Sequence, residues 1–248
     1  MRIFFALVLS IALAGSAAAQ MFSYESGRPD ARRTLTAGYY ALNFTYQGDG
    51  QPFPRLDFDR PVYGIRFAQP GFEVQLMYGP QSAEDGPSDI DVQLLDVGLL
   101  IYGGLPLTRQ ERFRLSLPIA LNSAYRVVGD DFNAGLTNEV FNFTTFGLGA
   151  GLALESKLTN RVTLDAKALP IGGLLLRSFE GTAGTTGLID ASVQLSFLDL
   201  FGTRGLSVGY GYRGQNWNVN ASDLSVGLED DTFDYSSVHH AFFVGLNF

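Results

Sequence analysis

Cysteine is absent from this 248-residue chain, and histidine and tryptophan occur only twice and once. Without cysteine there is no disulfide framework, no thiolate metal site and no lipid-modified N-terminal cysteine. Basic residues are outnumbered, and the net charge of −8 argues against a nucleic-acid partner, because phosphate binding needs a basic surface. Long hydrophobic runs are also missing beyond the N-terminus, although 46% of the residues are hydrophobic. The composition therefore excludes a helical membrane protein but is unusually apolar for a soluble one.

The N-terminus has the pattern of an export signal. Arg2 is followed by a short apolar stretch at residues 3–14 and then by an Ala-x-Ala end at Ala19. This order is typical of a secretory signal peptide, and the stretch is too short for the ~20 residues of a transmembrane helix. The alternative is a buried N-terminal helix. We predict a signal peptide over residues 1–19 and a single domain over residues 20–248.

The dominant pattern after residue 20 is alternation of apolar and polar or small residues, which favours β-strands over helices. Alternation is clear in the segment that begins at Phe113, where every second residue is apolar. Ten such segments predict ten strands, at residues 35–46, 61–69, 72–79, 90–102, 112–127, 140–154, 161–178, 188–198, 205–213 and 238–248. Two are irregular. A change of phase predicts a bulge near Leu94 and Leu95, and Pro170 predicts a bend or an early end of the seventh strand.

The connections between these segments alternate between long and short. The long ones contain fifteen Asp and Glu residues against only Arg55 and Arg60, whereas the short ones are balanced in charge. Long outer loops and short periplasmic turns are typical of membrane barrels. Hydrocarbon cannot satisfy an open sheet edge, so strands that cross a membrane must close into a barrel.

Charged residues within the strands fall on the face opposite the apolar residues. A membrane barrel must sort them in this way, because charge on the lipid face is costly. We expect the following side chains to face the lumen: Arg66, Glu73, Asp96, Arg112, Arg114, Arg126, Asp165, Lys167, Arg177, Asp190 and Arg213.

The C-terminal strand ends on an aromatic residue with apolar residues at alternate positions before it. The residues that share this face are His240, Phe242, Val244, Leu246 and Phe248. In this feature the chain resembles the outer-membrane β-barrel proteins of Gram-negative bacteria, although His240 is an imperfect match. The resemblance implies an outer-membrane location and implies that the barrel-assembly machinery reads these five residues.

The predicted fold is all-β, a transmembrane antiparallel up-and-down barrel of about ten strands. Eight strands result if one segment is misread, and twelve if the loop at residues 214–237 hides a hairpin. An interior of this size is close to one that side chains fill completely. Inward-facing glycines such as Gly149 and Gly209 either leave a narrow water path or accommodate neighbouring side chains.

Candidate chemistry is sparse. His239 is predicted to face inward with Ser237 on the same face, which suggests a nucleophile and base; some outer-membrane lipid hydrolases have such a pair in the reverse order. Hard cations favour carboxylates, so the acidic loops offer weak metal-ligand candidates. These candidates are Asp130, Asp131, Glu229, Asp230 and Asp231. No spacing matches an EF-hand, a phosphate loop or a His-Glu-x-x-His motif.

The sequence predicts a non-enzymatic barrel with a largely filled polar lumen, no cofactor, and acidic outer loops with a structural or surface-interaction role. The alternatives are a narrow passive pore for small solutes and a lipid or ester hydrolase. Expected partners are outer-membrane lipids and an extracellular or outer-membrane protein that contacts the loop at residues 214–237, which contains Trp217.

Overall fold

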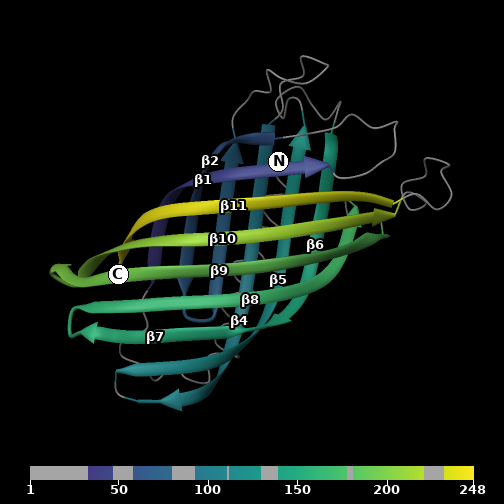
Figure 1. Cartoon of the computed structure of the whole chain (residues 1–248). Coiled ribbons are helices and arrows are strands. Elements are labelled where there is room, and N and C mark those ends of the chain that lie inside the picture. The colour runs from purple at the N-terminus through teal and green to yellow at the C-terminus, as the bar shows by residue number, and fades with distance from the viewer. Residues whose placement is uncertain are drawn as a thin grey trace.

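The structure, a computed structural model, describes residues 33–46, 58–79, 93–110, 112–129, 139–177, 181–220 and 232–248. Its strands are β1 (Thr34–Tyr46), β2 (Phe58–Gln69), β3 (Phe72–Gly79), β4 (Gln93–Arg109), β5 (Phe113–Gly129), β6 (Glu139–Ala150), β7 (Leu152–Thr159), β8 (Val162–Arg177), β9 (Gly181–Phe201), β10 (Arg204–Asn220) and β11 (Thr232–Asn247). All pairings are antiparallel, and β1 pairs with β11 along its whole length, which closes the sheet into a barrel (Figure 1). The predicted fold class is confirmed.

Strands β6 and β7 are two parts of one barrel strand. Ala150 of β6 lies opposite Ile119, and three residues later Ala153 of β7 lies opposite Ser116, so the register against β5 does not change. The register against β8 is likewise the same before and after the break. The barrel therefore has ten strands, as the alternation predicts.

The break between β6 and β7 lies beside Pro170. This proline does not end its own strand, since β8 is continuous through it, and the predicted early end is wrong. Proline has no N–H to donate to the neighbouring strand, so the ladder is interrupted there instead. The N–H of Gly151 donates to the carbonyl oxygen of Pro118, at 3.1 Å. A side chain at Gly151 would collide with the carbonyl of Ala168 on β8, which explains the glycine at this close approach.

The predicted bulge near Leu94 and Leu95 is also wrong. Strand β4 pairs without a register shift from Gln93 to Pro106, and its shift lies at the other end, before Thr108. Leu94 is fully buried inside the barrel. The change of phase in the sequence therefore marks an apolar interior, not an inserted residue.

Strands β9, β10 and β11 extend well beyond their predicted bounds. Residues 214–220 continue β10 and residues 232–237 begin β11, so the predicted loop at 214–237 is shortened to 221–231. These residues extend two strands that were already predicted, so they do not form the additional hairpin of the twelve-strand alternative. Trp217, predicted in a loop, lies near the C-terminal end of the paired strand β10, opposite Tyr235 of β11.

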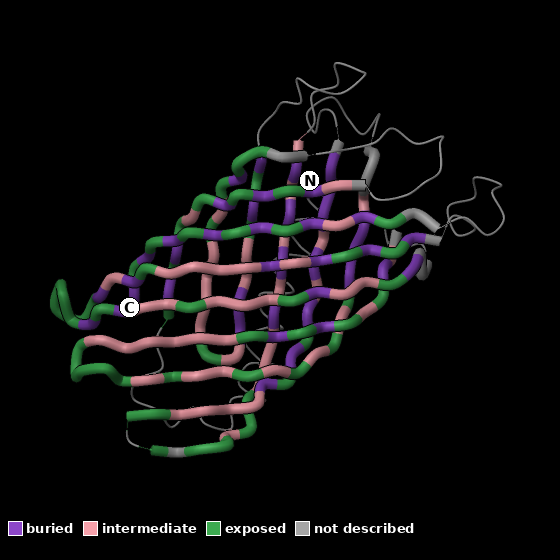
Figure 2. The backbone as a smooth tube through the Cα atoms, viewed as in Figure 1, coloured by how far each residue is buried: buried purple, intermediate pink, exposed green. Residues whose placement is uncertain are grey.

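The two faces of the sheet differ sharply in exposure. On β11, Phe242 is 60% exposed whereas its neighbours Ala241 and Phe243 are buried, and the same alternation repeats around the barrel (Figure 2). Every strand carries exposed large apolar side chains. Among the described residues, no helix is long and apolar enough to cross a membrane. A continuous apolar outer surface on a closed sheet is the architecture of a transmembrane barrel.

The barrel has two distinct ends. One end carries the turns that follow β2, β4, β7 and β9, together with Arg33 and Phe248, the first and last described residues, and it is called here the short-turn end. The opposite end, from which the longer connections leave, is called the long-loop end.

Candidate functional site

Apolar side chains fill the lumen toward the long-loop end and form what we call the aromatic plug. At its centre, the ring of Phe44 stacks on Tyr235 and meets the edge of Trp217, with both pairs of ring centroids 5.6 Å apart. The plug consists of Tyr40, Leu42, Phe44, Val62, Met77, Leu94, Val128, Phe143, Leu175, Trp217, Val219, Tyr235, Ala241 and Phe243. Trp217 is only 1% exposed, so this residue of the predicted contact loop does not itself face an external partner.

The plug arises because, near the long-loop end, apolar side chains point into the barrel and polar side chains point outward, the opposite of the arrangement in the rest of the strands. On β10, Trp217 and Val219 point inward, while Asn216 and Asn218 are exposed on the outside. On the outer face, Asn218 donates a hydrogen bond to Asp234 of β11, at 2.7 Å. Polar residues outside and apolar residues inside are typical of a sheet in water, so the strands continue past the apolar belt.

One ion pair is embedded in the plug. Arg126 of β5 donates from Nε to Asp96 Oδ2 of β4 at 2.7 Å, and both side chains are buried. The guanidinium carbon lies 4.8 Å from the ring centroid of Trp217 and 5.9 Å from that of Phe44. Arg126 therefore joins the ion pair to the aromatic rings through cation–π contacts.

A second group of charges crosses the lumen below the plug, and we call it the ion network. Glu73 of β3 accepts from Arg66 of β2 at 2.8 Å and from Lys167 of β8 at 2.6 Å. The hydroxyl of Tyr102 also donates to Glu73, at 3.3 Å. Because β3 and β8 are not adjacent in the sheet, the contact between Glu73 and Lys167 spans the interior.

The other half of the ion network is centred on Asp190 of β9. Lys167 Nζ lies 3.3 Å from one carboxylate oxygen, and Arg213 of β10 lies 3.1 Å from the other. Lys167 thus links the two carboxylates. The whole network comprises three cations and two carboxylates from five strands: Arg66, Glu73, Lys167, Asp190 and Arg213.

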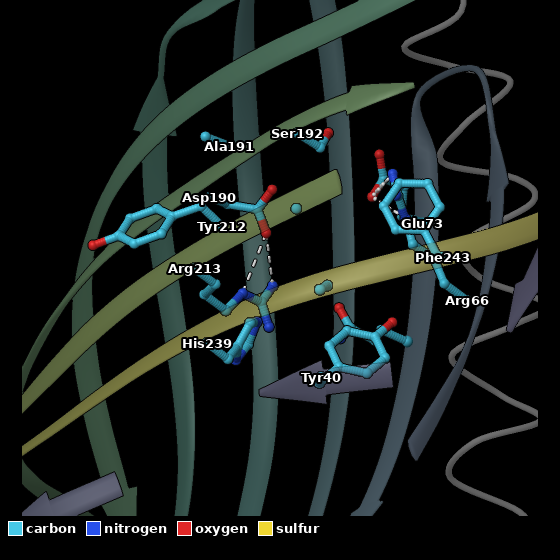
Figure 3. Close-up of a pocket in the computed structure, with 13 residues that line it drawn as sticks. Tyr40, Arg66, Glu73, Asp190, Ala191, Ser192, Tyr212, Arg213, His239 and Phe243 are labelled. Carbon is cyan, nitrogen blue, oxygen red and sulfur yellow. Dashed lines mark hydrogen bonds and ion pairs between the residues drawn. The ribbon is translucent and has the colours of Figure 1, made fainter. Parts of the chain in front are cut away.

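The lumen is packed less tightly toward the short-turn end on the side formed by β4 to β9. Inner-face residues there, such as Ser116, Ser192 and Gln194, are half-buried. A cavity of about 30 Å³ lies beside the ion network, lined among others by Tyr40, Arg213 and His239 (Figure 3). Such a volume holds about two water-sized molecules.

Most of the side chains predicted to face the lumen lie in these two groups. Arg114 and Asp165 are half-buried on the inner face nearer the short-turn end, where each makes further interactions. Arg112 is different, because β5 begins at Phe113 and Arg112 is exposed in the preceding turn. The side chain of Arg177 lies outside the described residues.

His239 and Ser237 both point into the barrel from β11 and are buried. The imidazole meets the ring of Tyr40 edge-on, with centroids 5.8 Å apart, and Ser237 Oγ and His239 Nδ1 make no hydrogen bond. Asp234 is exposed on the opposite face. A hydrolase needs its nucleophile within hydrogen-bond reach of a base that a third group orients, and these residues do not form that arrangement.

The five residues of the predicted C-terminal assembly signal share the outer face of β11. Phe242, Val244, Leu246 and Phe248 are exposed on this face. His240 is exposed too, and its Nδ1 forms a hydrogen bond with the Tyr210 hydroxyl at 2.6 Å. This partner explains how a polar ring is tolerated on an otherwise apolar face.

The predicted metal candidates and the predicted signal peptide lie outside the described residues. This applies to Asp130 and Asp131, to Glu229, Asp230 and Asp231, and to residues 1–19. Within the part of the chain that the structure describes, no group of three or more His, Asp or Glu side chains is placed to hold a metal ion.

The inward-facing glycines accommodate their neighbours. A Cβ at Gly209 would strike the ring of Phe243, and one at Gly149 would strike Ile171 and the carbonyl of Pro170. Apolar side chains thus occupy the space above these glycines, which leaves no water path at those positions.

Comparisons with known proteins give structural matches only. No family model and no curated protein matches the sequence. The outer membrane protease OmpT from Escherichia coli matches with a TM-score of 0.47 and 11% identity, over 92% of this chain and 99% of that chain. Neisserial surface protein A matches with a TM-score of 0.31 and 13% identity, over 87% and 95%. A FadL homologue of Pseudomonas aeruginosa matches with a TM-score of 0.30 and 11% identity, over 88% and 90%. At these identities the likeness concerns the fold alone.

Proposed function

We propose that this protein is a non-enzymatic, closed barrel of the Gram-negative outer membrane. It presents acidic loops outward in a structural or surface-interaction role. The observation that carries the proposal is the aromatic plug. The rings of Phe44, Trp217 and Tyr235 come from the neighbouring strands β1, β10 and β11, and Arg126, paired with Asp96, reaches two of these rings from the opposite side of the lumen, which fills it toward the long-loop end.

The outer face supports the membrane placement. Exposed apolar side chains surround the barrel, whereas the buried ion pairs lie inside it, where they avoid the cost of charge in lipid. The external loops are strongly acidic in sequence, and we expect them to repel anionic partners and favour basic or cation-bridged ones.

The passive-pore alternative requires a continuous water path. The ion network spans the lumen, and the central rings of the plug, those of Phe44, Trp217 and Tyr235, lie beyond it on the long-loop side, so a solute would have to displace both. The hydrolase alternative requires an accessible nucleophile and base, whereas Ser237 and His239 are buried without a hydrogen bond between them.

Membrane placement is tested by alkaline carbonate extraction and heat-modifiable gel mobility of the native protein. We expect the chain to stay with the membrane fraction and to run faster unheated than boiled. Full release by carbonate without detergent would overturn the membrane assignment.

Closure and lack of catalysis are tested on the purified barrel. Liposomes that contain it should swell in small sugars no faster than empty liposomes, and it should not hydrolyse ester substrates. Swelling that rises with protein content would favour the pore. Hydrolysis that His239→Ala abolishes would favour the enzyme.

A further inference from the structure

The cavity beside the ion network contains polar atoms that have no hydrogen-bond partner. Arg213 Nη1, Gln75 Nε2 and His239 Nδ1 are all buried, belong to residues that line the cavity, and make no hydrogen bond. Arg213 is 5% exposed and His239 3%. Arg213 Nη1 and Gln75 Nε2 are donors, and His239 Nδ1 is a donor in the tautomer that carries its proton there. A buried donor without a partner is costly, so these groups around one small space indicate a missing acceptor.

The nitrogen atoms of the Arg213 guanidinium point in two directions. Its Nε and Nη2 atoms are held by Asp190, at 3.2 and 3.1 Å. Figure 3 shows the remaining nitrogen turned away from Asp190, with the His239 ring beside the guanidinium. One edge of Arg213 is therefore structural, and the other is available to a ligand.

A glycine leaves room beside that free nitrogen. Gly98 of β4 faces inward, and a Cβ placed on it would lie 3.6 Å from Arg213 Nη1 and 4.0 Å from Gln75 Cβ. Arg213 and Gln75 thus approach the same space from non-adjacent strands, and the absence of a side chain at Gly98, which is not itself among the residues that line the cavity, leaves room beside Arg213 Nη1.

The ion network beside the cavity carries an excess positive charge. Its three cations contact two carboxylates, and of these cations Arg66 and Arg213 line the cavity whereas Lys167 does not. Arg126 and Asp96 neutralise each other. A buried charge is strongly disfavoured unless it is paired. Glu73 and Asp190 also line the cavity, but each is already engaged by two cations.

We propose that this cavity binds a monovalent anion of chloride size, held by Arg213, Gln75 and His239. Such an ion supplies both the missing acceptor and the missing negative charge. Water would satisfy the donors but not the charge, and a cation would be repelled by the free edge of Arg213 and could not accept its hydrogen bond. The ion enters from the short-turn end along the side of the lumen formed by β4 to β9, where inner-face residues such as Ser116 and Gln194 are only half-buried.

This inference goes beyond the closed-barrel proposal and does not depend on it, because the same residues would line a conducting lumen. The direct test is diffraction from crystals of the full-length barrel in sodium bromide, with data collected at the bromine absorption edge. We expect an anomalous peak between Arg213 Nη1 and Gln75. An ordered water with no anomalous signal at that position, or bromide only elsewhere, would overturn the proposal.

A titration in solution gives an independent test. A ligand that binds only the folded state raises the unfolding midpoint as its concentration rises. We expect sodium chloride to raise the midpoint relative to sodium gluconate at equal ionic strength, which holds screening constant. An equal midpoint in the two salts would contradict an anion site.

The matched variants are Gly98→Ala and Gly187→Ala. A methyl group at Gly98 fits at ordinary contact distance but occupies space beside Arg213, whereas one at Gly187 meets only Asn216 Oδ1, at 3.9 Å. Loss of one hydrogen bond to a charged group weakens binding about tenfold or more. We expect Gly98→Ala to weaken the chloride effect by at least that factor and Gly187→Ala to retain it. Equal chloride effects in both variants would refute this location for the site.

Discussion

Replacement of Trp217 by alanine should destabilise the barrel from the inside. The indole is almost completely buried, lies edge-on to Phe44 and lies beneath the guanidinium of Arg126. Alanine would leave a void at the centre of the plug and remove the aromatic face that Arg126 covers. The structure therefore predicts a loss of stability typical of a packed core, not of a surface loop.

The size of the loss follows from the burial. Truncation of a buried Trp to Ala costs about 3–5 kcal/mol in free energy of unfolding, which includes the cavity left behind. With a urea m-value of about 2 kcal/mol/M, the unfolding midpoint falls by about 1.5–2.5 M. The conservative variant Trp217→Phe keeps a ring in the plug and should lose only about 1–2 kcal/mol.

The assay is urea unfolding of the refolded barrel in detergent micelles, followed by gel mobility and circular dichroism. Trp217 is the only tryptophan, so fluorescence cannot follow the variants. In the wild type, however, the folded emission should be blue-shifted and protected from iodide quenching. A midpoint change below about 0.3 M for Trp217→Ala, or quenching as strong as in the unfolded chain, would refute a buried plug.

Three further predictions concern other parts of the barrel. Gly151→Ala should lower the refolding yield because its Cβ collides with β8, whereas Gly172→Ala, with no atom within 4 Å, should refold normally. Asp96→Ala should cost about 3–5 kcal/mol in urea unfolding because it leaves Arg126 unpaired, and the double variant with Arg126→Met should recover much of that loss. Phe248→Ala should reduce the heat-modifiable band in cells but not in detergent refolding, if its role lies in assembly.

Alternation along the chain predicted the ten strands and most of the lumen charges, and the long and short connections together with the C-terminal strand were needed to predict the closed sheet. The alternation is strong because lipid outside and polar groups inside impose opposite demands on neighbouring residues. The same reasoning locates Arg66, Glu73 and Lys167 on one face. It cannot reveal that they meet across the lumen, because that contact depends on closure and on side-chain length.

The plug was missed for a physical reason. Reasoning from lipid contact assigns every apolar residue to the outside, so Leu94 was interpreted as a change of phase and Trp217 as part of a loop. Beyond the apolar belt the surroundings are water, and the pattern inverts to Trp217 inside and Asn218 outside. These extensions could have been found by following each strand beyond its predicted end and looking for apolar residues at the inward positions and polar residues at the outward positions.

Single-channel recording in planar bilayers tests the closed barrel most directly. The account predicts that the wild-type barrel inserts without stable unit steps of conductance. It also predicts that the combined variant Phe44→Ala and Trp217→Ala, which removes the central rings of the plug, gives measurable leakage through the weakened interior. Reproducible unit steps from the wild-type protein would contradict closure and favour the passive pore.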